Sequence, residues 1–540
     1  MNKRKYVKRC SSYKTLDDYI VGKTGRHISD LNKYQVKYNL PALKNIANRI
    51  MNAVHTGKRI NVYADYDCDG ISSVDQFIML LQALQANFSV KVPKRFTDGY
   101  GIKTEYAKMV EPNSLLILVD NGIAALEAVE IAKSKNVEVI IMDHHMAFED
   151  DNDKIIYPKA DILLDPEAIP ENNDYCDYCG AGLTYKLAQY MLPDNHPFMD
   201  ICASFAAIGT VADMVPLTED NRQIVQRGLD AMNSGKTTAG LLFLIDKLGI
   251  SGHVTSEKIA FYLAPILNAS GRLYDDGATW AAQTLLETNQ NKVVAMVNTL
   301  IQINEMRKTI VAELMKQIYI DPNDKVNVIC TPDNSPLGCL GLVAGKITEA
   351  TKRTTFVYTN TGTILKGSAR SDDENKNHVK KMLDSIKQYM TAYGGHPGAA
   401  GFSFNKENEQ FIREKLLSYP VQPHDMTPYY DLDVKPQELS QMLEELDRCE
   451  PFGKNIERPT FAINCQFGNS GEYWRVCGAK REHITFNIPG TNYKAIAFGM
   501  KERYMKDGYP KNIRLIGNIV WNYYMGSKKP QFLVDDYEIM

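Results

Sequence analysis

The sequence has no hydrophobic run long enough to cross a membrane. Leu115–Val119 and Val139–Met142, among its longest apolar runs, are far shorter than the roughly 20 residues that a membrane-spanning helix needs. The first residues carry charge but no apolar core of the kind found in secretory signals. We therefore expect a soluble, cytoplasmic protein that does not contact membranes.

The sequence also lacks an excess of charge of either sign. Its 65 acidic residues slightly outnumber its 62 basic residues, which gives a net charge of −3. This balance excludes a protein that coats nucleic acid through bulk positive charge, so any nucleic-acid site must be local. The basic start is expected to be a solvated tail rather than a DNA contact; its basic residues are Lys3, Arg4, Lys5, Lys8 and Arg9.

Cysteines are scattered along the chain. The ten thiols lack the density and regular spacing of a secreted disulfide framework, so a reducing compartment is expected. Cys176 and Cys179 form a single Cys-x-x-Cys pair, and without a second pair at suitable spacing it does not predict a zinc site. We interpret both as ordinary cysteines.

Short apolar runs alternate with helical stretches between residues 59 and 213. This pattern is typical of a parallel sheet, with strands expected at 60–63, 115–119 and 137–142. The acidic, proline-containing stretch 149–179 is interpreted as an excursion over the surface.

The pattern changes twice further along the chain, and a length of 540 residues predicts three or four domains. Apolar residues at helical spacing predict a long helix at about 291–319, which leads to a second, smaller α/β unit. Beyond Pro420, short alternating runs predict a small all-β barrel.

The first candidate site is YADYDCDGISS, which follows a predicted strand and places Asp65, Asp67 and Asp69 at alternate positions. Three carboxylates within five residues repel one another unless a cation neutralises them, so the pattern favours a metal site over a solvated acidic turn. The spacing also opens an EF-hand loop, but Gln76 stands where calcium needs a bidentate Glu. A phosphatase of the haloacid-dehalogenase type, whose nucleophile loop resembles residues 67–71, remains an alternative at this point.

Two further predicted strands end in residues that bind metals. Asp120 follows one strand, and Asp143, His144 and His145 follow the next. Because the carboxyl ends of parallel strands meet at one edge of a sheet, these side chains should meet the three aspartates there. A further acid, Asp213, follows a helical stretch.

The mixture of residue types indicates the metal and the reaction. Carboxylates with imidazole and without thiolate suit Mn²⁺ or Mg²⁺ better than structural zinc. Two such ions about 4 Å apart stabilise the attacking and leaving oxygens of a phosphoryl displacement and lower the pKa of a bridging water. The sequence therefore predicts phosphoester hydrolysis with two divalent cations.

The order of the motifs resembles a known family. DYDCDG, VDNG, MDHH and GTVADMVPL resemble motifs I to IV of the DHH phosphoesterase superfamily. VPKRFTDGYG, LAPILNASGR, KGSARS, GGHPGAAG and EPFGKNIERP resemble the RecJ-type single-stranded-DNA-specific exonucleases, from about residue 40 to residue 540. The resemblance implies an N-terminal helical and basic segment (1–50), a parallel-sheet α/β DHH domain (51–285), a long linking helix (286–322), a smaller α/β DHHA1 domain (323–418) and a C-terminal OB-like β-barrel (419–540).

The resemblance also implies a set of metal ligands: Asp65, Asp67, Asp69, Asp120, His144 and Asp213. In this family Asp67 and Asp69 would bind separate metals, and Asp120 would bridge them. His144 and Asp213 would complete the ligands of the second metal.

The implied catalytic residues are Asp69, Asp120 and His145. His145 would lie near the scissile phosphate and stabilise developing charge. Asp143 would orient the histidines, and Asp65 would be a ligand of the first metal or support one.

Implied contacts to the substrate are Arg95, Arg272, Ser368, Arg370, Gly395 and His396. From the residues alone, the guanidinium of Arg272 beside a glycine turn can fork onto a phosphate. The glycines of 394–401 can turn backbone N–H groups toward an anion, although a plain turn fits the sequence equally.

The C-terminal domain of such enzymes guides single-stranded DNA. Trp474, Trp521, Tyr523 and Tyr524 lie near basic residues and offer the mixture of stacking and charge that such a groove needs. Half or more of these aromatic residues are expected in the barrel core, so none is singled out as a contact.

We therefore expect a metal-dependent, monomeric exonuclease that hydrolyses single-stranded DNA from its 5′ end in DNA repair and recombination. Candidate partners are a single-strand-binding protein and a helicase. One alternative is a DHH phosphodiesterase that acts on short or cyclic oligonucleotides. The β domain predicted after Pro420 disfavours this alternative. The other is a non-catalytic DNA-binding scaffold. In a scaffold of this kind, we would expect some of the residues in the metal-binding motifs to be lost.

Overall fold

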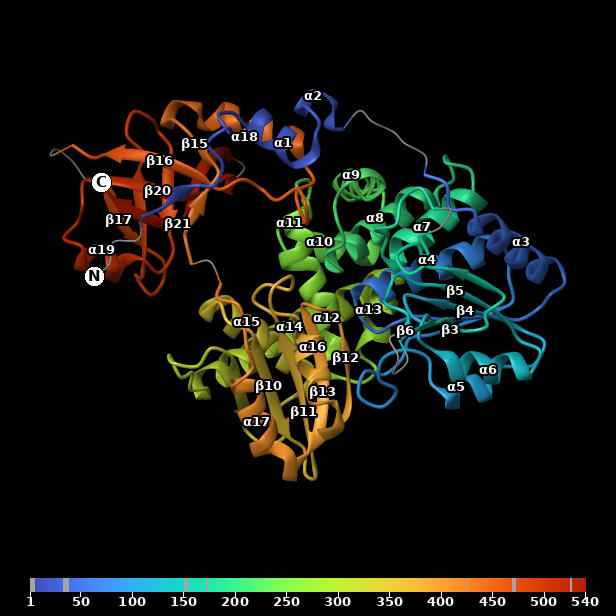
Figure 1. Cartoon of the computed structure of the whole chain (residues 1–540). Helices are drawn as coiled ribbons and strands as arrows, with labels where there is room; N and C mark the ends of the chain where they lie inside the picture. Colours follow the sequence, from blue (N-terminus) through green and yellow to red (C-terminus); the bar gives the residue numbers. More distant parts are fainter. Residues whose placement is uncertain are drawn as a thin grey trace. The chain divides into compact units, whose positions relative to one another are not determined.

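The computed structural model describes residues 5–32, 38–149, 154–170, 173–424, 426–468, 473–524 and 527–540. These residues form two compact units (Figure 1). The larger unit is built from the described parts of 37–215 and 220–425, and the smaller unit from those of 1–36, 216–219 and 426–540. Within the described ranges, no helix combines the length and the apolar character needed to cross a bilayer.

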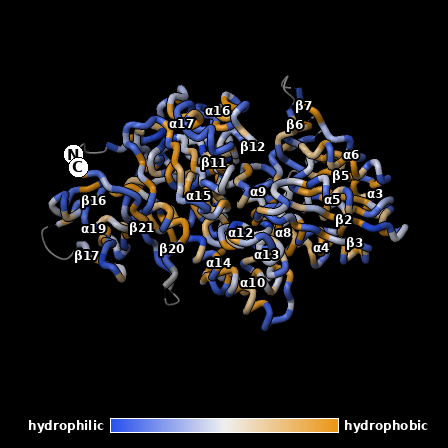
Figure 2. The backbone as a smooth tube through the Cα atoms, turned by 90° about the horizontal axis from the view of Figure 1, so that it is seen from below, coloured by the Kyte–Doolittle hydropathy of each residue, from blue (hydrophilic) through white to orange (hydrophobic). Residues whose placement is uncertain are grey.

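A five-stranded parallel sheet organises the first part of the larger unit. Its strand order is β3 (Phe88–Lys91), β2 (Ile60–Tyr63), β4 (Leu115–Val119), β5 (Glu138–Met142) and β8 (Ile162–Leu164). β2 and β4 are buried along their whole length, as expected for strands covered on both faces, and hydrophobic stretches run through this region in Figure 2. The three predicted strands are confirmed. The interpretation of 149–179 as a surface excursion is wrong for β8, which is a strand of the sheet.

Helices cover both faces of this sheet (Figure 1). On one face, Leu116, Leu118 and Ile141 pack in one cluster with residues of α5 (Thr104–Met109) and α6 (Leu126–Ser134). α4 (Cys68–Ala83) packs against α7 (Gly180–Met191) and α8 (Phe198–Ala212). The remaining elements are α3 (Ala42–His55), β6 (Phe148–Glu149), β7 (Ile155–Ile156), α9 (Glu219–Asn233), α10 (Ala239–Lys247), α11 (Ser256–Lys258), the π-helix η1 (Ile259–Leu263), α12 (Ala264–Leu273) and α13 (Gly277–Leu286).

A 28-residue helix, α14 (Gln290–Gln317), follows these elements. The side chain of Asn289 caps it by accepting hydrogen bonds from the backbone N–H groups of Asn291 and Lys292. Because α14 packs against both α12 and α15 (Leu337–Thr351), it connects the two α/β parts of the larger unit. The predicted long helix is confirmed.

A second five-stranded sheet forms the rest of the larger unit. Its order is β12 (Met390–Gly395), β13 (Ala399–Asn405), β11 (Ile364–Arg370), β10 (Thr355–Asn360) and β9 (Asn327–Thr331), with only β9 and β10 parallel. Its other helices are α16 (Val379–Asp384), η2 (Lys387–Tyr389), η3 (Lys406–Asn408) and α17 (Glu409–Leu417). The glycine-rich segment 394–401 covers the end of β12, the turn and the start of β13. Gly395 has a φ of 142°, and a Cβ there would lie 2.3 Å from the carbonyl oxygen of Ala399, so only glycine fits.

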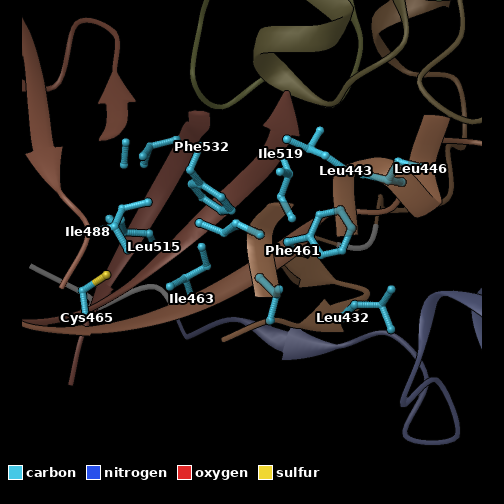
Figure 3. Close-up of a cluster of buried hydrophobic side chains, with 14 of the residues drawn as sticks. Leu432, Leu443, Leu446, Phe461, Ile463, Cys465, Ile488, Leu515, Ile519 and Phe532 are labelled. Atoms are coloured by element: carbon cyan, nitrogen blue, oxygen red, sulfur yellow. The ribbon is translucent and has the colours of Figure 1, made fainter. Parts of the chain in front are cut away.

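The smaller unit contains a seven-stranded sheet. Its order is β15 (Leu432–Asp433), β16 (Phe461–Gln466), β20 (Asn512–Tyr524), β21 (Ser527–Ile539), β19 (Lys494–Ala497), β18 (His483–Asn487) and β17 (Trp474–Cys477). Figure 3 shows Leu443 of α18 (Leu439–Cys449) beside Ile519 and Phe461 of the sheet. The OB-like β-domain is confirmed, but among the described residues the sheet is open, because no strand pairing joins β15 to β17.

The N-terminal residues belong to the smaller unit. β1 (Val7–Lys8) pairs in parallel with β14 (Tyr429–Tyr430), and α1 (Leu16–Thr24) and α2 (Ile28–Leu31) bury apolar side chains in the same core as the sheet. Lys8 and Arg9 form ion pairs with Asp433 and Asp431. The prediction of a solvated tail is therefore wrong for these two residues, and Lys3 and Arg4 lie outside the described part. The remaining elements are η4 (Pro436–Glu438) and α19 (Lys501–Lys506).

Candidate active site

Acidic side chains gather at the carboxyl edge of the parallel sheet. Asp65 and Asp67 follow β2, and Asp120 follows β4. Each of these three carboxylates offers an oxygen within 4.8 Å of the others. Asp120 also belongs to a second such group, with Asp143, His144 and His145. The arrangement therefore places Asp120 between an all-carboxylate group and a group that contains imidazole.

His144 lies among the other predicted ligands. Its Nε2 is 3.1 Å from Oδ1 of Asp120 and 3.7 Å from Oδ2 of Asp69. Its Nδ1 is 3.7 Å from Oδ2 of Asp213. Burial and the neighbouring charge of His145 lower the pKa of His144 to about 3, so its imidazole is neutral, which is the form that binds a metal.

The carboxylates at this edge repel one another. Burial and the charge of Asp67 raise the pKa of Asp65 to about 8 and also raise the pKa of Asp69. Burial and the charge of Asp69 also raise the pKa of Asp120. Oδ1 of Asp65 is buried and has no hydrogen-bond partner among the described residues. A divalent cation bound here would relieve the repulsion and stabilise the charged forms.

Asp143 is engaged by other protein groups. It accepts hydrogen bonds from His145 Nδ1 at 2.7 Å and from the backbone N–H groups of Ile123 and His144. Burial acts to raise the pKa of Asp143, but the charge of His145 and the hydrogen bond to it outweigh burial and lower the pKa to about 2. The same pair raises the pKa of His145 to about 10 against the effect of burial. His145 therefore carries a positive charge next to the acidic group.

The N-terminus of α7 holds Asp69 in place. The backbone N–H of Gly180 donates to Oδ2 of Asp69 at 2.7 Å, and that of Ala181 donates to Oδ1 at 2.9 Å. A Cβ on Gly180 would lie 2.6 Å from the Cβ of Asp120, and one on Gly209 would lie 2.5 Å from Oδ1 of Asp69. Sequence reasoning missed this support because it is made by the backbone. In the sequence, the closely spaced glycines at the start of an apolar helix are the feature that could have indicated this support.

Three arginines lie close together beside the acidic group. The charges of Arg95 and Arg370 lower the pKa of Arg272 to about 10, after the larger effect of burial. Arg95 stacks its guanidinium 3.9 Å from the ring centre of Tyr66, and Arg370 donates to Oγ of Ser368 at 3.0 Å. None of the three arginines forms an ion pair with any residue that the structure describes. Like charges without acidic partners are typical of an anion site.

The turn that follows β12 reaches the histidines. The rings of His396 and His145 are 5.8 Å apart and nearly parallel, and the backbone of His396 pairs with Ala399 across the turn. The structure therefore brings Gly395 and His396, from the second sheet, next to the predicted site on the first.

Three family models match the chain in one order. The DHH family N-terminal domain matches residues 59–210, the DHHA1 domain matches residues 323–419, and the RecJ OB domain matches residues 430–536. The chain therefore carries a DHH domain, a DHHA1 domain and a RecJ OB domain, in this order.

Individual relatives agree with this assignment. The single-stranded-DNA-specific exonuclease RecJ of Bacillus subtilis is 27% identical over 529 residues, which cover 94% of this chain and 65% of that protein. The enzyme of the same name from Thermus thermophilus is 29% identical over 87% of this chain and 68% of its own. The crystal structure of Thermus thermophilus RecJ with Mn²⁺ superposes with a TM-score of 0.78 at 26% identity, covering 96% of this chain and 75% of that one. The chain thus spans about two thirds of the length of these first relatives.

The aromatic residues of the RecJ OB domain are largely engaged in packing. Trp521 donates to Asp447 at 2.8 Å, and Lys528 lies 4.0 Å over its ring. Trp474 stacks on Tyr509 at 5.3 Å. The side chains of Tyr523 and Tyr524 lie outside the described part. Trp474 and Trp521 are partly buried and pack against the core of the smaller unit; that half or more of the set belongs to this core stays a prediction.

Proposed function

We propose that this chain is an exonuclease that hydrolyses single-stranded DNA from its 5′ end with two divalent cations, Mn²⁺ or Mg²⁺. The observation that carries the proposal is the position of Asp120, which shares one group of ligand atoms with Asp65 and Asp67 and whose Oδ1 lies 3.1 Å from Nε2 of His144, beside Asp69. A shared carboxylate between two groups of donors is what a two-ion site requires. The names of the relatives, single-stranded-DNA-specific exonucleases, supply the substrate.

The residues present fit two such ions. Asp65 and Asp67 would hold one ion, and Asp69, His144 and Asp213 the other, with Asp120 between them. The nearby thiols do not compete, because burial raises the pKa of Cys68 and Cys179 well above the ordinary value and leaves oxygen and imidazole donors that suit Mn²⁺ or Mg²⁺. When bound, the ions would polarise the phosphoryl group and lower the pKa of a water.

The chain's own side chains supply charge around the scissile phosphate. His145, held by Asp143 at 2.7 Å and positively charged, would stabilise negative charge that develops on the phosphoryl oxygens. Arg272 and the two arginines beside it would bind the terminal 5′ phosphate, together with Ser368. A terminal phosphate held at a fixed position would give cleavage from the 5′ end.

We also infer the biological setting from the family. Hydrolysis of single-stranded DNA suits repair and recombination, where a helicase exposes a single strand and a single-strand-binding protein covers it. Both remain candidate partners of a monomeric enzyme. The domain boundaries at residues 51, 286, 323 and 419 remain our proposal.

One assay separates this function from its alternatives. A single-stranded oligonucleotide labelled in turn at each end would be incubated with Mn²⁺, beside its blunt duplex, a dinucleotide and the Asp120→Ala variant. Immediate release of mononucleotide from the 5′ label, little cutting of the duplex and an inactive variant are expected. Cleavage of the dinucleotide alone would favour a short-substrate phosphodiesterase, and binding without cleavage under any metal would favour a DNA-binding scaffold.

A further inference from the structure

A cavity within the larger unit contains none of the proposed metal ligands or substrate contacts among its described lining residues. Its volume is about 550 Å³, which is in the range of sites that bind small molecules. Residues of α4, β3, α13 and α14 line it, and α13 packs against α4 (Figure 1). The cavity is therefore a separate place at which this unit could hold a ligand.

Asp75 of α4 lies in the wall of this cavity. It is 0% exposed, and neither of its carboxylate oxygens has a hydrogen-bond partner among the described residues. Buried polar groups are almost always paired, and an unpaired one destabilises the folded chain. Burial raises the pKa of Asp75 well above its ordinary value, and no neighbouring positive charge opposes this effect. Within the described ranges, the chain therefore supplies no positive group for this carboxylate.

The other charged groups of the cavity wall interact with their own neighbours. Lys91 pairs with Asp98 at 3.2 Å, and Asp276 pairs with Lys94 at 3.0 Å. Hydrogen bonds from the two backbone N–H groups that follow Glu287 lower the pKa of this residue, so it is charged. Because Lys91 is already neutralised, the wall favours a positively charged ligand over a negatively charged one.

The chemistry of the wall favours an organic cation over a metal ion. Ca²⁺ and Mg²⁺ take about six or more oxygen ligands, whereas Asp75 belongs to no group of three candidate metal ligands among the described residues. Much of the remaining wall is apolar: Val74, Ile78, Val90, Leu286 and Met296. An ammonium group on an alkyl chain matches both features, since its N–H groups can donate to a carboxylate while its methylene groups are buried against apolar side chains.

We propose that this cavity binds a primary aliphatic amine, whose ammonium group pairs with the carboxylate of Asp75. Because Asp75 is covered in the empty cavity, the ligand would reach it as side chains of the wall shift, and the unbranched Met296 can adapt readily. The inference does not rest on the proposed function, because the six residues between Asp69 and Asp75 on α4 correspond to about 9 Å along the helix. The bound amine would stabilise the larger unit, since it binds the folded chain.

The test uses the whole chain with hexylamine as the ligand, beside 1-hexanol, which has the same alkyl chain but no charge. Titrations followed by saturation-transfer NMR should give hexylamine a dissociation constant at least about tenfold lower than that of hexanol, the usual gain from a hydrogen bond to a charged group. Asp75→Asn should remove this preference, because it keeps the shape of the side chain and removes its charge. The matched control is Asp246→Asn, which removes an exposed acid of α10 outside the cavity and should keep the preference.

Several results would overturn the proposal. If the natural chain binds hexylamine no better than hexanol, or binds neither, the cavity does not recognise an ammonium group. If Asp75→Asn keeps the full preference, the amine binds elsewhere. If Asp246→Asn loses the preference as well, the effect is one of overall charge. The comparison of the two ligands on the natural chain decides the matter even if Asp75→Asn does not fold, and none of these results bears on DNA cleavage.

Discussion

The backbone N–H of Gly180 donates a hydrogen bond of 2.7 Å to Oδ2 of Asp69. This bond joins the first turn of α7 to a carboxylate on α4, more than a hundred residues earlier in the chain. Because the positive end of a helix favours a negative group, α7 both positions Asp69 and stabilises its charge.

We expect Gly180→Ala to lower kcat about 100-fold, the size of effect that a displacement of about 1 Å can have at a reacting centre. The new Cβ would lie 2.6 Å from the Cβ of Asp120. Steady-state kinetics on a single-stranded oligonucleotide measure the effect. Gly182→Ala is the matched control, since a Cβ there meets no atom closer than 3.4 Å; equal losses in the two variants would contradict the prediction.

Asp120→Asn should lower activity at least about 100-fold, because it removes a charged ligand that both ions would share. Isothermal titration with Mn²⁺ should show that both binding events weaken, whereas Asp213→Asn should weaken only one. A variant of Asp120 that kept one ion at its natural affinity would argue against the bridging position.

Arg272→Ala should raise KM for a 5′-phosphorylated oligonucleotide roughly tenfold or more, since a hydrogen bond to a charged group contributes about 1.5–3 kcal/mol. With a 5′-hydroxyl oligonucleotide the change should be much smaller. Arg353→Ala is a suitable control, because within the described ranges the hydrogen bonds of the Arg353 side chain go to the backbone carbonyls of Asp321 and Pro322. An equal rise in KM with and without the 5′ phosphate would mean that Arg272 contacts another part of the DNA strand.

Binding of single-stranded DNA should weaken steeply with salt, because each neutralised phosphate releases counterions. Arg370→Gln should reduce the slope of log K against log salt by about 0.7, the value for one contact to a single strand. Fluorescence anisotropy at several salt concentrations, in Ca²⁺ to prevent cleavage, gives the slope. An unchanged slope would mean that Arg370 does not contact a phosphate.

Ile20→Ala should destabilise the smaller unit by about 2–5 kcal/mol, the usual cost of such a cavity. Ile20 is fully buried in the core that the C-terminal sheet forms. Trp474 and Trp521 report on unfolding of this unit, and Trp280 reports on the larger one. An unchanged transition at the two C-terminal tryptophans would mean that the N-terminal helices contribute nothing to this core.

The parallel sheet and its acidic edge could be predicted because the central strands are short, largely apolar runs, each followed within two residues by a carboxylate. Leu115–Val119 and Asp120 are the clearest case, since a short apolar run of this kind is typical of a strand buried on both faces. β8 escaped prediction because its three apolar residues are too short a signal among the prolines and acids around them.

Two other features could not be found from the sequence for a different reason. The pairing of β1 with β14 involves two residues on each side, and nothing in Val7 or Lys8 specifies a partner so distant in the chain. The hydrogen bonds from Gly180 and Ala181 to Asp69 use backbone groups that every residue except proline possesses.

The place of residues 5–32 in the smaller unit has a consequence for biosynthesis. Leu16, Tyr19 and Ile20 are translated about 400 residues before the strands that bury them. At roughly 5–20 residues per second this interval lasts on the order of 20–80 s. During that time the larger unit can complete its folding, whereas these apolar side chains have no core in which to be buried. We therefore expect that the N-terminal helices, and not the larger unit, depend on a chaperone or on rapid translation in a newly made chain.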